Sequence, residues 1–270
     1  MKKQYKRALT IAGSDPSGGA GIQADLKTFS ACGCFGTSAI VAVVDENTIG
    51  VTGVHPIPVD FVVGQIRSVL DDIGADAIKI GMLHSSELIR AVRDTLALYP
   101  LRNIVLDPVM VATSGDALLQ QEAIETLKNE LMPSARVITP NIPEAQILLG
   151  RKIGSQDELP QAARELSADT RVSVLLKAGH LHERELVDVF YNAETDELVY
   201  LPSERLDTKN THGTGCTLSS AVAAFLAQGL ELNQAVIQAK EYINSAIRCG
   251  AEYEIGHGHG PVHHFFNFWE

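Results

Sequence analysis

The sequence predicts a single three-layer α/β domain over residues 1–270, with helices on both faces of a mostly parallel central sheet. Two observations support this prediction. Short, continuous apolar segments alternate with amphipathic segments along the chain, as in successive β-α-β units. Hydrophobic residues make up 45% and charged residues 20% of the 270 residues, an ordinary composition for a chain with one large core. No linker, internal repeat or low-complexity segment interrupts the pattern.

Apolar runs of strand length predict the sheet. The predicted strands cover residues 7–13, 37–44, 77–82, 103–109, 136–140 and 172–179, and a hairpin is predicted at 187–201. The run TSAIVAVV at 37–44 is predicted to be a strand buried in this sheet.

Apolar residues at helical spacing predict the segments between the strands. In residues 18–33, for example, Ile22, Leu26 and Phe29 lie on one face of a helix. Helices are predicted at 18–33, 59–74, 86–100, 117–132, 157–168, 215–228 and 232–249.

The charge balance excludes some classes of partner. Lys and Arg number 22 against 33 Asp and Glu, a formal net charge of −11, which argues against a nucleic-acid surface. Nucleotides are not excluded, because backbone N–H groups can hold phosphates. No apolar run approaches the roughly 18 residues of a membrane span, and the run near residue 10 is too short for a signal peptide. A cytoplasmic location is therefore expected.

Glycines and polar residues follow several predicted strands, where α/β folds place their active sites. The loop GSDPSGGAG at 13–21 matches neither the P-loop nor the G-x-G-x-x-G pattern. Asp107 ends one later strand, and Asn141 and Glu144 follow the next. Neighbouring carboxylates suit Mg²⁺, although Glu144 could equally be an acid that stabilises a helix N-terminus. Lys177 ends another strand, where it could meet phosphate.

The segment NTHGTGCT at 210–217 combines a glycine-rich turn, a helix start and a thiol. Gly213 and Gly215 permit a turn whose N–H groups form an anion site, and the helix N-terminus adds positive potential. The same field is expected to lower the pKa of Cys216, so that a thiolate near neutral pH takes a proton from a hydroxyl. The alternative is a small buried hydrophobic residue.

These segments resemble one family along nearly the whole chain. The motifs AGSDPSGGAGIQADLKTFSACG, KIGML, VLDPVM, TPNIPEA, LLKAGH, TKNTHGTGCTLSSA and GHGPVHHF look like the hydroxymethylpyrimidine/phosphomethylpyrimidine kinases of thiamine synthesis, members of the ribokinase-like superfamily. The resemblance implies a ribokinase-like fold, a homodimer, and use of ATP and Mg²⁺. It also implies two phosphorylations, first of 4-amino-5-hydroxymethyl-2-methylpyrimidine and then of its monophosphate.

The resemblance also implies roles for individual residues. Cys216 takes the place of the base that activates the acceptor hydroxyl, and Gly213, Thr214 and Gly215 complete an anion hole with it. Asp107, Asn141 and Glu144 organise Mg²⁺, and Lys177 lies near the ATP phosphates. Gly13, Asp25, Met82 and Val109 match positions around the pyrimidine. The chain departs from the family at DENT (45–48), because Glu46 stands where the family commonly has a glutamine that reads the ring.

Other functions remain open at this point. A pyridoxal or pyridoxine kinase of the same superfamily differs only in the acceptor. A cysteine hydrolase needs a histidine base, and nothing in the sequence orients His212 for that role. A non-catalytic ligand binder would not need Asp107, Glu144 and the glycine turn together. The tail GHGHGPVHHF contains His257, His259, His263 and His264 and is expected to serve packing.

Overall fold

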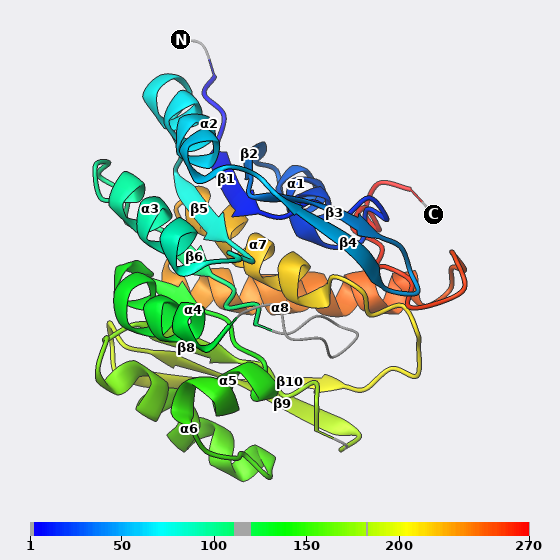
Figure 1. Cartoon of the computed structure of the whole chain (residues 1–270). Coiled ribbons are helices and arrows are strands. Elements are labelled where there is room, and N and C mark those ends of the chain that lie inside the picture. Colours follow the sequence, from blue (N-terminus) through cyan, green and yellow to red (C-terminus); the bar gives the residue numbers. More distant parts are fainter. Residues whose placement is uncertain (1–2, 111–119, 182, 270) are drawn as a thin grey trace.

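The chain folds around an eight-stranded sheet with helices on both faces (Figure 1). The computed structural model describes residues 3–110, 120–181 and 183–269. The strand order is β10-β9-β8-β7-β6-β5-β1-β2. Neighbouring strands from β2 to β8 are parallel, and β9 and β10 join one edge in antiparallel orientation. The predicted α/β sandwich with a mostly parallel sheet is therefore confirmed.

The strands lie where the apolar runs placed them, with shorter bounds. They are β1 Arg7–Ala12, β2 Phe35–Ile40, β5 Ala77–Ile80, β6 Ile104–Leu106, β7 Val137–Ile138, β8 Ser173–Leu176, β9 Glu185–Asn192 and β10 Glu197–Glu204. The predicted hairpin at 187–201 is the β9–β10 pair. Residues such as Gly13 and Asp107 thus come directly after their strands, at the carboxyl edge of the sheet.

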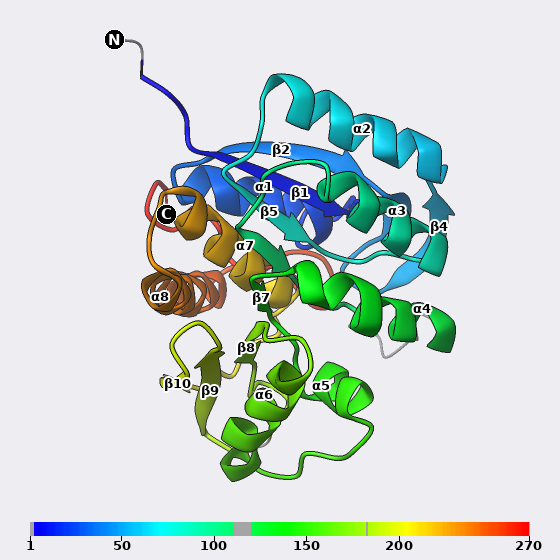
Figure 2. The same cartoon turned by 90° about the vertical axis from the view of Figure 1, so that its left-hand side faces the viewer.

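Alternate strand residues enter two separate hydrophobic clusters, one on each face of the sheet. Leu9 and Ile11 pack with α2 Val59–Asp72, α3 Ser86–Leu96, α4 Gln121–Thr126, α5 Ile142–Leu149 and α6 Leu159–Ala168. Ala8 packs on the opposite face with α1 Gly21–Ala31, α7 Thr214–Ala227 and α8 Leu232–Gly250. Figure 2 shows α7 and α8 on one side of the sheet and α3 and α4 on the other. No helix in the described part of the chain has both the length and the apolar composition needed to cross a membrane.

The predicted helix at 117–132 is less regular than expected. After α4 the chain forms a π-helical turn at Leu127–Leu131 and a 3-10 turn at Met132–Ser134. Pro133 lacks the N–H that a further helical turn would require, so the helical segment as a whole ends in this 3-10 turn. The first part of the prediction, residues 117–119, lies outside the described residues.

The prediction of one buried strand at 37–44 is wrong: its first half belongs to the edge strand β2, where Ala39 is the one buried residue, and its second half lies outside the large sheet. After β2, the chain leaves the large sheet and forms a separate antiparallel hairpin of β3 Ala42–Glu46 and β4 Val51–Pro56. Ala42 and Val44 are buried, whereas Val43 is 49% exposed, the alternation of a strand with one free face. The sequence concealed this pattern because valine occupies both faces. The hairpin carries Glu46 at the end of β3.

The β3–β4 hairpin is held by the segment 256–259, more than 200 residues away. The N–H of His259 donates to the carbonyl oxygen of Thr48 at 2.7 Å, and the N–H groups of His257 and Gly258 donate to Thr48 Oγ1 at 3.2 Å. A Cβ on Gly258 would lie 1.9 Å from the Thr48 carbonyl oxygen, so only glycine fits there. The histidine-rich segment therefore contributes its backbone to packing.

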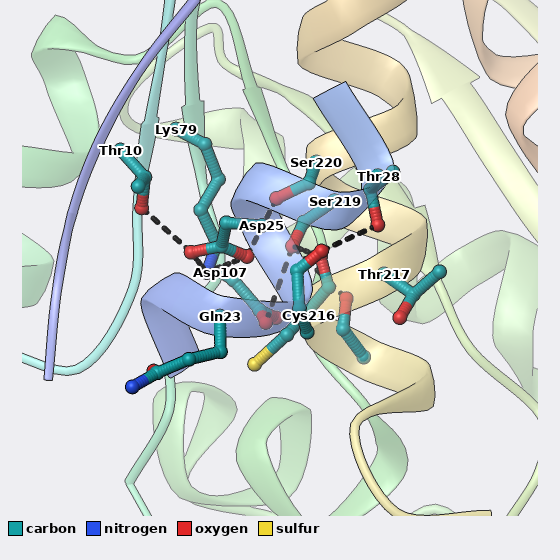
Figure 3. Close-up of polar contacts among 12 residues, drawn as sticks. Thr10, Gln23, Asp25, Thr28, Lys79, Asp107, Cys216, Thr217, Ser219 and Ser220 are labelled. Atoms are coloured by element: carbon teal, nitrogen blue, oxygen red, sulfur yellow. Dashed lines mark hydrogen bonds and ion pairs between the residues drawn. The ribbon is translucent and has the colours of Figure 1, made fainter. Parts of the chain in front are cut away.

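A fully buried ion pair joins Asp25 of α1 to Lys79 of β5, with Lys79 Nζ at 2.9 and 2.8 Å from the two carboxylate oxygens (Figure 3). Thr10 Oγ1 of β1 and Ser220 Oγ of α7 each donate to the same carboxylate at 2.6 Å. Burial opposes the charge on Lys79, but Asp25 outweighs it and leaves the lysine pKa raised. The carboxylate thus ties together four elements of the fold.

We predict that Lys79→Met destabilises the protein by about 3–5 kcal/mol, because it leaves the Asp25 carboxylate buried without its counter-charge. The double variant Asp25→Leu/Lys79→Met should recover much of this loss, since it removes both charges. Urea denaturation measures the free energy of unfolding.

The matched control for this prediction is Arg7→Gln, which breaks the partly exposed Arg7–Asp76 pair and should cost about 1 kcal/mol or less. An unchanged unfolding midpoint in Lys79→Met would show that the buried pair does not stabilise the fold.

Candidate active site

A cavity of about 1100 Å³ opens at the carboxyl edge of the parallel strands. β1 lies between β2 and β5, so the chain leaves β1 in one direction and returns on its other side, an arrangement that opens a crevice in α/β sheets. The predicted site residues that line it are Gly13, Glu46, Met82, Asp107, Val109, Asn141, Glu144, Lys177 and Gly213–Cys216. A second cavity of about 400 Å³, between residues 207–210 and 251–258, contains none of the predicted residues.

The start of α7 lines the first cavity, the one of about 1100 Å³. Gly213 caps the helix with φ +75°, and a Cβ at this position would lie 1.7 Å from the carbonyl oxygen of Gly19. Both the backbone conformation and the close approach therefore require glycine. The first-turn N–H groups of a helix have no acceptors within the helix. Because Thr214, Gly215 and Cys216 line the cavity, this end of α7 can bind an anion there.

The structure overturns one prediction about Cys216. Burial raises the pKa of the thiol to about 11; Lys79 opposes this shift, and the carboxylates of Asp25 and Asp107 add to it. Figure 3 shows Cys216 in the first turn of α7, close to Asp107. The expected thiolate near neutral pH is therefore wrong, because the helix field was weighed without the two carboxylates that the fold brings near. The role of Cys216 as base stays a prediction.

Lys177 and Asp107 form an ion pair beside the start of α7. Lys177 Nζ lies 3.2 Å from Asp107 Oδ1, and Thr139 Oγ1 donates to the same oxygen at 3.0 Å. A Cβ on Gly215 would lie 3.4 Å from Lys177 Nζ and 3.6 Å from Asp107 Oδ2. Burial by itself would raise the pKa of Asp107, but Lys177 and Lys79 hold it below its usual value. Lysine, carboxylate and helix N-terminus thus meet at one point of the cavity.

Asn141 and Glu144 form a capping box at the start of α5. Asn141 Oδ1 accepts from the Glu144 N–H at 2.9 Å, and Glu144 Oε2 accepts from the Asn141 N–H at 2.8 Å. Burial raises the pKa of Glu144 to about 7, with Lys177 opposing the shift and Asp107 adding to it. The capping alternative for Glu144 is thus present in the structure, and the metal role stays a prediction.

The residues predicted around the acceptor ring do not all reach the cavity. Gly13, Met82, Val109 and Glu46 line it. Asp25 does not, because its side chain is fully buried with both oxygens bonded to Lys79, Thr10 and Ser220. The direct ring contact predicted for Asp25 is therefore corrected: this residue supports the site from within the core.

A pair that the sequence did not reveal joins Asp15 to His212. His212 Nε2 lies 2.8 Å from Asp15 Oδ2, so the prediction that nothing orients this histidine is wrong. Burial alone would lower the pKa of His212, but the hydrogen bond and charge of Asp15 leave it raised. The sequence SDPSG hints at a local turn around Asp15, but no local signal indicates a partner 197 residues away.

Glu46 lies beside this pair, with Oε1 at 3.9 Å from His212 Nε2. Burial raises the pKa of Glu46, and the negative charge of Asp15 adds to the shift. In the described residues His212 Nε2 bonds to Asp15 and no hydrogen bond joins the ring to Cys216, which does not favour the cysteine hydrolase.

The far end of the cavity lies between the β9–β10 edge and α8, where an apolar patch is flanked by charged side chains such as Glu204, Arg205 and Lys240. Leu186 and Pro202 contribute from the strands, and Ile243 and Ile247 from the helix. The sequence carried no motif for this part of the site. The cavity thus extends from the acidic group at Asp15, past the anion site of α7, to this apolar patch.

The chain is similar to known kinases along nearly its whole length. A family model described as phosphomethylpyrimidine kinase matches residues 15–263. The hydroxymethylpyrimidine/phosphomethylpyrimidine kinase of Rhizobium meliloti (strain 1021) is 49% identical over 264 residues, covering 97% of this chain and 98% of that protein.

Two solved structures confirm the ribokinase-like fold. An ADP complex of the pyridoxal kinase of Bacillus subtilis superposes with a TM-score of 0.89 at 40% identity, covering 97% of this chain and 98% of that one. The phosphomethylpyrimidine kinase of Clostridium difficile 630 superposes with a TM-score of 0.78 at 42% identity, covering 89% and 99% of the two chains.

The raised pKa of Cys216 predicts slow alkylation at neutral pH. With a pKa of about 11, roughly one thiol in 10⁴ is ionised at pH 7, and the rate should rise about tenfold per pH unit up to about pH 10. Iodoacetamide labelling of Cys216, followed by peptide mass spectrometry, measures this rate. A free cysteine peptide is the control and should level off above about pH 8.5. A plateau for Cys216 below pH 9 would contradict the assignment.

Proposed function

The chain belongs to the phosphomethylpyrimidine kinase family, and we propose that it phosphorylates 4-amino-5-hydroxymethyl-2-methylpyrimidine with ATP. A second transfer converts the monophosphate to the diphosphate, in thiamine biosynthesis. In each step the bond between the γ-phosphorus and the bridging oxygen of ATP breaks. A new bond forms from that phosphorus to the acceptor oxygen, and ADP leaves.

The observation that carries this proposal is the position of Cys216 and the start of α7. On one side the thiol lies near the backbone N–H of Gly21, at the start of α1, which favours its ionised form and lines the cavity. On the other side Gly215 abuts Lys177 and Asp107. A phosphoryl group at this helix N-terminus would therefore lie between an acceptor hydroxyl at Cys216 and a nucleotide on the Lys177 side.

Phosphoryl transfer depends mainly on positioning and charge neutralisation, which these residues can supply. Lys177 and the first-turn N–H groups of α7 face the charge that spreads over the transferred oxygens. Cys216 holds the acceptor hydroxyl in line. To act as base it first releases its own proton to solvent, and the thiolate then takes the hydroxyl proton as the new bond forms. A modest base suffices, because little charge develops on the attacking oxygen in a loose transition state.

The apolar patch at the far end of the cavity suits an adenine ring. Leu186 and Pro202 on one wall and Ile243 and Ile247 on the other leave room for a flat base between strand and helix. Arg248 also lines this part of the cavity and can meet the nucleotide's negative charge. This placement puts the phosphates toward Lys177.

The carboxylates near Lys177 suit Mg²⁺, which would neutralise phosphate charge when bound. Three buried carboxylates, Asp25, Asp107 and Glu144, lie near two lysines, Lys79 and Lys177. One carboxylate charge is therefore left without compensation when all three are ionised. Burial raises the pKa of Glu144, and the negative charge of Asp107 adds to the shift. Asp107 and Glu144 would hold the ion, directly or through water, and Asn141 would orient Glu144.

The assembly and location belong to the same proposal. The outward face of the β3–β4 hairpin carries Val43, which is 49% exposed, and Ile49 in the turn is 72% exposed; this surface suits a homodimer contact. A cytoplasmic location and a single-domain organisation complete the proposal.

The second candidate is a pyridoxal kinase, favoured by the similarity to the Bacillus subtilis protein. Both candidates use the same nucleotide site and differ in the acceptor. Measuring ADP release with the pyrimidine, its monophosphate, pyridoxal and pyridoxine decides between them. A kcat/KM for pyridoxal or pyridoxine far above that for the pyrimidine would replace the first proposal with the second.

Replacing Cys216 tests the proposed base. Cys216→Ala should lower kcat by about 10²–10⁴-fold and leave the ATP KM nearly unchanged, because the anion site is backbone. Cys216→Asp should retain more activity than the alanine variant, since a carboxylate can also accept the proton. Steady-state kinetics with the pyrimidine measures both variants. Wild-type turnover in Cys216→Ala would refute the base assignment.

Glu144→Gln tests the metal role separately from the capping role, because glutamine can complete a capping box as well as glutamate. The variant should need severalfold more Mg²⁺ for half-maximal rate while keeping its unfolding midpoint. Glu165→Gln, which alters an exposed acid paired with Arg151, is the control. An unchanged Mg²⁺ titration in Glu144→Gln would leave the residue only its capping role.

A further inference from the structure

The acceptor end of the cavity contains three ionisable side chains whose hydrogen bonds can be counted. Asp15 is fully engaged: its oxygens accept from the N–H groups of Ser17, Gly19 and Ala20, from Ser17 Oγ, and pair with His212 Nε2. These donors account for its negative charge. Asp15 therefore holds the loop and the histidine, with four of its donors on Oδ2 and the Ser17 N–H on Oδ1.

Glu46 is in the opposite situation. Its carboxylate lies 3.9 Å from His212 Nε2, beyond hydrogen-bond distance, and that nitrogen already bonds to Asp15. Among the described residues no donor lies within hydrogen-bond distance of the Glu46 carboxylate. The side chain is only 18% exposed and lines the cavity. A half-buried carboxylate with no protein donor requires donors from whatever occupies the cavity.

The net charge of Asp15, Glu46 and His212 also indicates that a ligand supplies a proton here. The charged groups facing Glu46 are Asp15, from the β1–α1 loop, and His212, from the segment before α7. With His212 protonated and both carboxylates ionised, the three residues carry a net charge of −1. Burial and Asp15 raise the affinity of Glu46 for a proton. A ligand that brings one proton to this position neutralises the group.

Glu46 is also held in place. It ends β3, directly before the turn whose Thr48 accepts three N–H groups from residues 257–259. The same distant segment binds the His212 side of the cavity, because the His212 N–H donates to the carbonyl oxygen of Gly260 at 3.0 Å. A single segment thus fixes the backbones that carry Glu46 and His212, so the carboxylate meets a ligand in a set position.

We propose that the acceptor ring binds with one additional proton, taken from solvent and shared between a ring nitrogen and the Glu46 carboxylate. The substrate class is an aromatic alcohol whose ring carries an amino group beside a ring nitrogen. The neutral edge of such a ring offers one donor and one acceptor, and a carboxylate can pair only with the donor. With the proton added, two parallel hydrogen bonds form to the two carboxylate oxygens, one of them charge-assisted. This inference rests on the proposed function and concerns its acceptor.

Calorimetry tests the proposal through the number of protons taken up. The pyrimidine is titrated into the whole protein at pH 8 in two buffers that differ in enthalpy of ionisation. The wild type should take up about one proton per bound pyrimidine. Its Kd should weaken by up to about tenfold per pH unit above pH 8, because binding consumes a proton. Glu46→Gln, whose amide pairs with the neutral edge, should take up none and bind with little change in Kd between pH 7 and 9.

Asp45→Asn is the matched control. It makes the same change from carboxylate to amide one residue away, at an exposed position outside the cavity, and should behave as the wild type. Wild-type binding without proton uptake, or equal uptake in wild type and Glu46→Gln, overturns the proposal. ADP release, measured in parallel, distinguishes failure of this inference from failure of the proposed function. Phosphorylation of the pyrimidine without proton uptake overturns this inference alone, whereas absence of both binding and phosphorylation overturns the proposed function as well.

Discussion

The buried ion pair between Asp25 and Lys79 is the interaction on which the position of the active-site helix depends. The carboxylate of Asp25 binds β5 through Lys79, β1 through Thr10 and α7 through Ser220. Because two charges in the core are favourable only when their geometry is satisfied, this arrangement admits little displacement of α7 against the strands. The N-terminus of α7, less than two turns from Ser220, is therefore held where β1 and β5 end. The position of the anion site therefore depends on how the core packs around α7.

The same pair begins a series of alternating charges that reaches the cavity. Lys79 is influenced by Asp25 and Asp107, Asp107 by Lys177 and Lys79, and Lys177 by Asp107 and Glu144. Each charge is stabilised by the neighbours on either side, and each is largely shielded from water. Cys216 lies within this series: burial raises the pKa of its thiol most, Asp25 and Asp107 add to the shift, and Lys79 opposes it. At Cys216 the helix N-terminus favours the thiolate, whereas the two carboxylates favour the thiol. Burial also favours the thiol and is the largest cause of the raised pKa.

Much of the fold and part of the site could be predicted from the sequence, for identifiable reasons. The carboxyl ends of parallel strands meet at one edge, so placing Asp107, Glu144 and Lys177 after consecutive strands was sufficient to predict that they converge. The pairing of Asp15 with His212 could not be found in this way, because it joins two loops across 197 residues. Asp25 was misplaced because sequence position does not tell whether a helical side chain faces a cavity or the interior. The β3–β4 hairpin was missed because valine on an exposed face resembles valine in a core.

The attachment of Thr48 to residues 257–259 has a consequence for how the protein is made. During synthesis the first strands emerge long before this segment, and contacts across about 209 residues form late because a large loop must close first. The hairpin that carries Glu46 has few partners of its own before then. The nascent chain can thus begin to assemble the sheet before the turn beside Glu46 is held. A translation product that stops short of residues 256–261 would keep Glu46 but lack the backbone contacts that fix Thr48 next to it.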